Sequence, residues 1–173
     1  LCGSSAIGEE LPAAIREMCE DGQDPVFLIA GSLTRQSIAQ TEYLRGKGYP
    51  VITFDTETIF DEEAFSREEE RLAGEALKAM KQAPLVLVHS AQQPERVQAT
   101  KEKGQKLGFT HEEIGKRISG CLCRVTRRVL TETGCRKLVV AGGDTSAAVT
   151  GELEIYRMEI GEEIEAGVPA MTG

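Results

Sequence analysis

The chain has 173 residues, the size of one ordinary globular domain with too little left over for a second. Hydrophobic residues make up 40% of it and charged residues 28%, a balance that excludes disordered, fibrous and disulfide-scaffold proteins. The formal net charge of -8 disfavours nucleic acid and anionic membranes as partners, whereas a small anion needs only backbone N–H groups at a helix N-terminus.

The predicted elements alternate, in chain order, between short apolar strands and longer helices. They are a helix over 9–20, a strand over 25–30, a helix over 34–46, a strand over 51–54, a helix over 66–82, a strand over 85–88, a helix over 110–132, a strand over 137–141 and a short helix around 147–149. A polar loop is expected after the third strand, up to residue 108. The final stretch, 154–173, has mixed strand character and leaves its topology open.

This alternation is typical of a parallel sheet with crossover helices. The strand over 25–30 is apolar on both of its faces, so we expect helices to cover it on both sides. The predicted fold class is therefore α/β, with a parallel-rich sheet, helices on both faces and a Rossmann-like architecture.

Two capping boxes give the predicted starts of the longer helices. They are Ser66 with Glu69 and Thr110 with Glu113, each a hydroxyl residue followed by glutamate at the third position. The acidic runs at 61–63 and 68–70 are interpreted as solvated helix faces rather than as metal sites.

The cysteines and the N-terminal residues indicate the compartment. The five cysteines are odd in number and have no C-x-x-C spacing, so we interpret them as reduced thiols of a cytoplasmic protein. The longest apolar runs, 26–30 and 85–88, are far shorter than the roughly 20 residues of a membrane span. Because the chain does not begin with methionine, we expect it to be a piece of a longer protein.

The candidate binding site lies at the strand ends, because ligands of open parallel sheets bind beyond the carboxyl ends of the strands. Gly142 and Gly143 follow an apolar strand and allow a tight turn with a close approach to the backbone. Asp144, Thr145 and Ser146 then fall at a helix N-terminus, where free N–H groups and the helix dipole favour a phosphate. The alternative is that Asp144 or Ser146 only caps the helix and that the glycines only turn the chain.

A second junction of the same kind, Gly31-Ser32, follows the strand over 25–30 and is expected at the same sheet edge. Neither junction matches a Walker loop or a G-x-G-x-x-G turn, which disfavours a nicotinamide dehydrogenase. His89 is a conceivable general base and His111 is expected to be exposed. Cys135 has no obvious histidine partner, so the sequence identifies no catalytic residue and no metal ligand set.

Three segments, taken in this order, resemble the C-terminal, nucleotide-binding half of the four-carbon acid sugar kinases. They begin with Gly31-Ser32-Leu-Thr-Arg, continue with Val-Ala-Gly-Gly-Asp-Thr-Ser over 140–146 and end with Glu-Ala-Gly-Val-Pro over 165–169. The resemblance covers essentially the whole chain, and its second and third segments are more specific than the first.

The resemblance implies a nucleotide-binding domain that holds ATP and magnesium. The positions that it matches to ATP contacts are Ser32, Gly142, Gly143, Asp144 and Thr145, with Ser146 adjacent. It also implies an ATP-dependent kinase that phosphorylates a hydroxyl of threonate, erythronate or a related oxo-acid, the acid sugar being held mainly by a separate N-terminal half. That half's Asp-Asp-x-Thr-Gly motif and a later Lys-x-Gly-x-Phe-Gly segment have no counterpart here, so residues 1–173 are expected to be an incomplete domain, inactive by itself.

Two other functions remain open at this point: a non-catalytic module that senses a nucleotide or phosphate, and a purely structural domain. The expected partners are ATP and a small acid sugar, with no nucleic acid and no membrane. Assembly into a homo-oligomer is left open by the sequence.

Overall fold

The structure is a computed structural model that describes residues 2–3, 24–31, 33–90, 93–165 and 168–172. The helix predicted over 9–20 therefore lies outside the described residues. The strands of the main sheet are β1 (Cys2–Gly3), β2 (Val26–Ala30), β3 (Val51–Phe54), β4 (Leu85–Ser90) and β5 (Lys137–Ala141). The helices are α2 (Arg35–Gly46), the 3-10 helix η1 (Thr56–Phe60), α3 (Glu62–Met80), α4 (Pro94–Lys106), α5 (His111–Thr133) and α6 (Gly143–Glu152).

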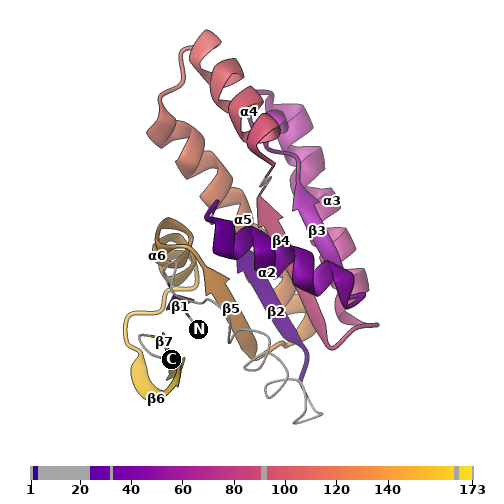
Figure 1. Ribbon diagram of the computed structural model, residues 1–173, viewed down its shortest axis with the longest axis vertical. Helices are drawn as coiled ribbons and strands as arrows, with labels where there is room; N and C mark the ends of the chain where they lie inside the picture. Colours follow the sequence, from indigo (N-terminus) through magenta and orange to yellow (C-terminus); the bar gives the residue numbers. More distant parts are fainter. Residues whose placement is uncertain (1, 4–23, 32, 91–92, 166–167, 173) are drawn as a thin grey trace.

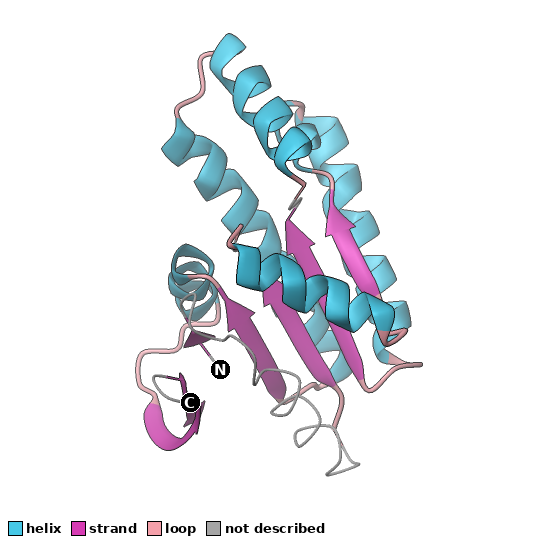
Figure 2. Cartoon of the chain, viewed as in Figure 1, coloured by secondary structure: helices cyan, strands magenta, loops and turns pink. Residues whose placement is uncertain are grey.

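The five strands form one sheet in the order β1-β5-β2-β4-β3, and every pairing in it is parallel. Strand β2 lies in the middle, with Ile29 opposite Val88 of β4 on one side and Val140 of β5 on the other. All four carboxyl ends of β2 to β5 therefore point to the same edge, as Figure 2 shows. The predicted α/β class with a parallel sheet is confirmed.

Helices cover both faces of this sheet, as predicted. Helix α2 packs Leu44 onto the face that carries Leu28 and Leu87, whereas α3, α5 and α6 pack onto the opposite face. Figure 1 shows α2 in front of the sheet and α3 and α5 behind it. The connection through α2 runs from β2 to the edge strand β3. The connections through α3 and α5 run back across the sheet in the opposite direction, from β3 to β4 and from β4 to β5. Since parallel crossovers are right-handed, the two directions require opposite faces.

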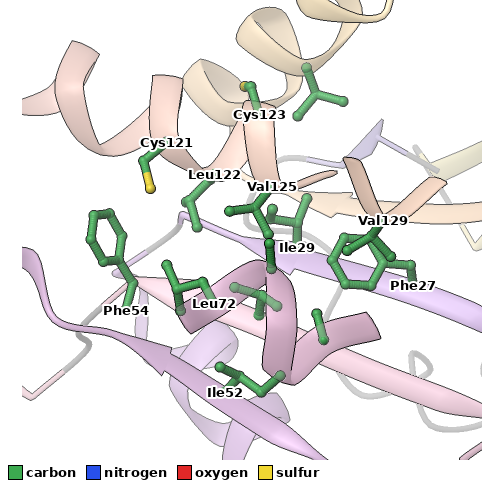
Figure 3. Packing of buried hydrophobic residues seen from close by; sticks show 14 of the residues in the cluster. Phe27, Ile29, Ile52, Phe54, Leu72, Cys121, Leu122, Cys123, Val125 and Val129 are labelled. Carbon is green, nitrogen blue, oxygen red and sulfur yellow. The ribbon is translucent and has the colours of Figure 1, made fainter. Parts of the chain in front are cut away.

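The larger core lies between the sheet and helices α3 and α5 (Figure 3). Leu72 of α3 and Leu122 of α5, both fully buried, belong to this core, in which Phe27 of β2 lies next to Val129 of α5. Cys121 and Cys123 are part of the same core, and burial raises the pKa of their thiols to about 12 and about 11. These thiols are therefore protonated packing groups near neutral pH.

The last described strands form a separate hairpin. Strands β6 (Glu159–Glu165) and β7 (Val168–Thr172) pair antiparallel, and β7 contacts β1 at the edge of the main sheet. The strand character expected for this stretch is confirmed, and the hairpin supplies the topology that the sequence left open. None of the helices in the described ranges combines the length and the apolar composition that crossing a bilayer requires.

Two predictions of secondary structure are wrong, the start of one helix and a loop that contains another. Helix α3 begins at Glu62 rather than at Ser66, because the Asp61 carboxylate accepts the Ala64 N–H at 2.8 Å and caps the helix one turn earlier. The loop predicted up to residue 108 contains α4, a helix of 13 residues with Pro94 in its first turn. The other capping box, Thr110 with Glu113, is present as predicted at the start of α5.

One of the acidic residues interpreted as solvated is buried. Glu68 is only 7% exposed, and its carboxylate accepts the Asp55 N–H at 2.7 Å. The same carboxylate pairs with Arg71, which in turn donates to the Thr53 carbonyl. Because both groups are hydrogen-bonded to the backbone at the end of β3, burial of this charge is compensated and the strand end is fixed in place.

Candidate functional site

A cavity of about 300 Å³ lies at the carboxyl ends of the parallel strands, at the sheet edge where ligands of such folds bind. One side is lined by Gly31 directly after β2, by Ser90 at the end of β4 and by Asp144 and Thr145 in the first turn of α6, which follows β5; α4 and α5 form the opposite wall. Figure 1 shows α4 and the start of α5 extending past this end of the sheet. The lining residues are Gly31, Leu33, Thr56, Ser90, Val97, Thr100, Lys101, His111, Ile114, Gly115, Ile118, Ser119, Asp144 and Thr145.

The N-terminus of α6 opens without a side-chain cap. Its N-cap residue is Gly142, whose φ of 117° is a conformation that residues with a side chain rarely adopt. The first hydrogen bond of the helix runs from the Ser146 N–H to the Gly142 carbonyl at 2.8 Å. The N–H groups of Gly143, Asp144 and Thr145 come before this bond and have no acceptor within the helix. This end of α6 therefore offers hydrogen-bond donors and the positive end of the helix dipole.

The two glycine junctions meet directly. The Gly31 N–H donates to the Ala141 carbonyl at 3.1 Å, so the chain leaves β2 alongside the end of β5. A Cβ atom added to Gly31 would lie 2.0 Å from Oγ1 of Thr145, a distance that no real contact allows. Glycine at position 31 is thus required by the approach of the Thr145 side chain, which is 4% exposed.

The predicted site residues separate into three groups. Asp144, exposed, and Thr145, buried, both line the cavity. Gly142, Gly143 and Ser146 shape the start of α6 but are not among the lining residues; the Ser146 Oγ is buried and finds no hydrogen-bond partner among the described residues. Ser32 lies outside the described residues, next to Gly31. Asp144 does not cap the helix, since it follows the N-cap residue, so the capping alternative is wrong for this side chain.

The opposite wall was missed by the sequence reasoning. Val97, Thr100 and Lys101 belong to α4, the helix predicted as a loop. Thr100 and Lys101 come three and four residues after Val97, so the three share one face of the helix. On α5, His111, Gly115 and Ser119 repeat every four residues and form a stripe along the cavity. This stripe of polar residues and glycine has no apolar periodicity. The spacing of four residues is therefore the one feature of the sequence that could have indicated it.

Neither histidine is placed as a general base by its contacts. His89 is 3% exposed; its Nδ1 lies 2.6 Å from the Ser90 carbonyl and its Nε2 lies 2.9 Å from Oγ1 of Thr53. Burial lowers the pKa of His89, so the ring is neutral and its two hydrogen bonds hold the end of β4. His111 is exposed, as predicted, and lies at the cavity with its ring 3.2 Å from the Gln105 amide nitrogen.

The remaining strand end, Asp55, has a structural role. Its carboxylate caps η1 at the Glu57 N–H and lies 3.2 Å from the Arg96 guanidinium. Across the described ranges, no three His, Cys, Asp or Glu side chains gather closely enough to hold a metal ion by themselves.

Comparison with known proteins gives a consistent result. A family model described as "Nucleotide-binding C-terminal domain" matches residues 27–172. The 3-oxo-isoapionate kinase of Paraburkholderia graminis is 29% identical over 151 residues, which are 84% of this chain and 32% of that kinase. The 3-oxo-tetronate kinase of Cupriavidus necator is 32% identical over 146 residues, 84% of this chain and 31% of the kinase.

A solved structure supports the same fold. The crystal structure of a Haemophilus influenzae protein superposes with a TM-score of 0.70 at 22% identity, over 86% of this chain and 34% of that protein. The chain therefore spans about a third of the length of the relatives that it matches.

Proposed function

Because the chain belongs to the family of nucleotide-binding C-terminal domains, we propose that it binds ATP as one part of a kinase for a four-carbon acid sugar. The observation that carries the proposal is the junction of Gly31 with Thr145 beside the open N-terminus of α6. It combines three backbone donors, a helix dipole and a hydroxyl at the edge of a cavity, which is the chemistry that a polyphosphate requires.

This geometry supports the following assignment of the site residues. The N–H groups of Gly143, Asp144 and Thr145 are assigned to phosphate oxygens, and the Thr145 hydroxyl adds a hydrogen bond. Gly142 supplies the turn, and Ser32, which lies outside the described residues, is assigned to the nucleotide from the sequence resemblance alone. Ser146 lies behind the cradle, because its Oγ is buried and is not part of the cavity lining.

Asp144 is the residue that we assign to magnesium. A carboxylate next to a triphosphate is repelled unless a cation lies between them. Mg²⁺ bound with a nucleotide takes one or two carboxylates together with phosphate oxygens, so the single exposed Asp144 fits it without a larger acidic cluster. When bound, the ion would neutralise charge on the phosphates.

The acid sugar is proposed from the relatives, which are named kinases of 3-oxo-isoapionate and 3-oxo-tetronate. This chain matches only about a third of each, so we assign the acid sugar and the catalytic base to the part of the protein outside these residues. Transfer of the terminal phosphoryl group of ATP to a sugar hydroxyl depends mainly on positioning both reactants. The 173-residue chain should therefore retain nucleotide binding and lack kinase activity.

The proposal is tested by calorimetric titration of the chain with Mg-ATP. Thr145→Val replaces the hydroxyl by a methyl group of similar size, and we expect ATP affinity to fall about twofold to 150-fold, the range that covers the loss of one neutral or one charged hydrogen bond. Thr150→Val on the same helix is the control, since the Thr150 hydroxyl bonds the Ser146 and Ala147 carbonyls away from the cavity. Absence of any ATP binding by the unaltered chain at millimolar concentration contradicts the proposal.

A further inference from the structure

The cavity has two chemically different sides. The side formed by Gly31, Asp144 and Thr145 offers polar groups and is the one assigned above to phosphates. The opposite side, formed by α4 and α5, carries an apolar patch of Val97, Ile114, Gly115 and Ile118 next to the polar residues Thr100, Lys101, His111 and Ser119. Phosphates are bound by polar groups and gain nothing from apolar side chains. Phosphate binding therefore explains the polar side of this cavity but not the apolar residues of α4 and α5.

Gly115 is the unexpected residue of the apolar side. It is the fifth residue of α5, where glycine is less favourable than alanine because it loses more backbone freedom on folding. A Cβ atom added at Gly115 would meet no described atom within 4 Å, so packing inside the described structure gives no reason for glycine.

The contrast with two other glycines is clear. A Cβ atom at Gly31 would collide with Thr145, and one at Gly104 of α4 would lie 2.4 Å from Cδ1 of Ile114. These two glycines are explained by their neighbours in the protein. Gly115 instead leaves the backbone of α5 uncovered where that helix forms the cavity wall.

We propose that the α4–α5 wall holds the base of the nucleotide, and that Gly115 lets the flat ring lie against the backbone of α5. This inference rests on the proposed function, since it places the phosphates at the N-terminus of α6. The base is the one apolar, planar part of a nucleotide, and the aliphatic side chains of Val97, Ile114 and Ile118 match it. Gly115 is thereby a specificity-determining residue that favours nucleotides over simple polyphosphates.

The test compares ATP with inorganic tripolyphosphate, each with magnesium, in calorimetric titrations of the 173-residue chain. Gly115→Leu places a side chain in the space of the base, so ATP affinity should fall about tenfold or more while tripolyphosphate affinity changes by less than about twofold. Gly115→Ala should lower ATP affinity in the same direction by a smaller factor. The alanine variant keeps the test valid if the leucine variant has a lowered melting temperature, because alanine stabilises a helix relative to glycine.

Gly74 provides the matched control. It lies inside α3, is exposed, and its Cβ would also meet no atom within 4 Å, but it does not line the cavity. Gly74→Leu should therefore leave both affinities unchanged. Unchanged ATP affinity in Gly115→Leu, or an equal loss of affinity for ATP and tripolyphosphate, overturns this inference. Neither result contradicts the proposed function, because the unaltered chain still binds ATP. If the unaltered chain binds no ATP, the proposed function itself fails, so the two failures are distinguishable.

Discussion

At the scale of single residues, Gly31 after β2 lies in close contact with Thr145 in the first turn of α6, which follows β5. This contact lies at the proposed phosphate-binding site. We expect Gly31→Ala to lower the free energy of unfolding by about 1–3 kcal/mol, because its methyl group must displace the Thr145 side chain. Urea unfolding followed by circular dichroism measures this loss. Gly46→Ala, at a helix end where a Cβ meets no atom within 4 Å, is the control and should change stability little.

A double variant shows whether the loss arises from this contact. Thr145→Ala removes the Oγ1 atom that the new methyl group would strike, so Gly31→Ala should cost less in that background than in the unaltered chain. Strict additivity of the two single changes would contradict the proposed collision.

Asp144 gives the second prediction at this scale. Asp144→Asn removes one charge and keeps the shape of the side chain, so we expect the magnesium dependence of ATP affinity to disappear. The melting temperature should change little, since the lost interaction with the helix dipole is worth only about 0.3–1 kcal/mol. Titrations with and without magnesium measure the effect.

The matched control for Asp144→Asn is Glu152→Gln, which removes the same charge at the other end of α6, where Glu152 pairs with Arg127. It should leave the magnesium dependence intact. An Asp144→Asn variant that still gains as much ATP affinity from magnesium as the unaltered chain would show that Asp144 does not contact the ion.

Sequence reasoning predicted one side of the cavity and missed the other, for a physical reason. Asp144 and Thr145 follow two glycines after an apolar strand, so local chain chemistry identifies them. Gly115 and Val97 belong to helices that are brought to the strand ends by tertiary packing. Their local sequence does not indicate that packing, so their place in the cavity wall could not be predicted. Ser32, predicted with them, lies outside the described residues.

At the scale of elements, the start of α3 shows how two similar signals compete. Ser66 and Glu69 have the spacing of a capping box, but Asp61 caps the helix with a hydrogen bond to the Ala64 N–H. Asp61→Ala should lower stability by about 0.5–2 kcal/mol, the usual cost of losing a helix cap. Ser66→Ala should be neutral or slightly stabilising, because an exposed residue inside a helix gains from alanine. Thermal melts of both variants check this, and the opposite order would contradict the observed boundary.

Helix α4 was missed because its sequence is strongly polar. Its inward face carries few large apolar residues, with Thr100 and Gly104 at its buried positions, so it has little apolar periodicity. A start signal was present, since Pro94 with Glu95 in the first turn is typical of a helix N-terminus. Thr100 replaces apolar packing by a hydrogen bond, its hydroxyl lying 2.7 Å from that of Thr56.

At the scale of the whole molecule, the alternation of strands and helices was enough to predict a parallel sheet covered on both faces. The strand order β1-β5-β2-β4-β3 was not predictable in the same way, because local patterns do not say which strands become neighbours. That order places the end of β2 between the ends of β4 and β5. It thereby brings Gly31 and Thr145 together, although they are far apart in sequence.

The central claim is that phosphates of ATP bind at the N-terminus of α6, beside the end of β2. The most direct measurement is a two-dimensional ¹H–¹⁵N NMR titration of the 173-residue chain with Mg-ATP. We predict the largest shifts at the amides of Gly143, Asp144, Thr145 and Gly31, since these groups contact or flank the phosphates. Unshifted amides at these four positions under millimolar Mg-ATP, or shifts confined to another surface such as the groove lined by Phe65 and Arg124, would contradict the account.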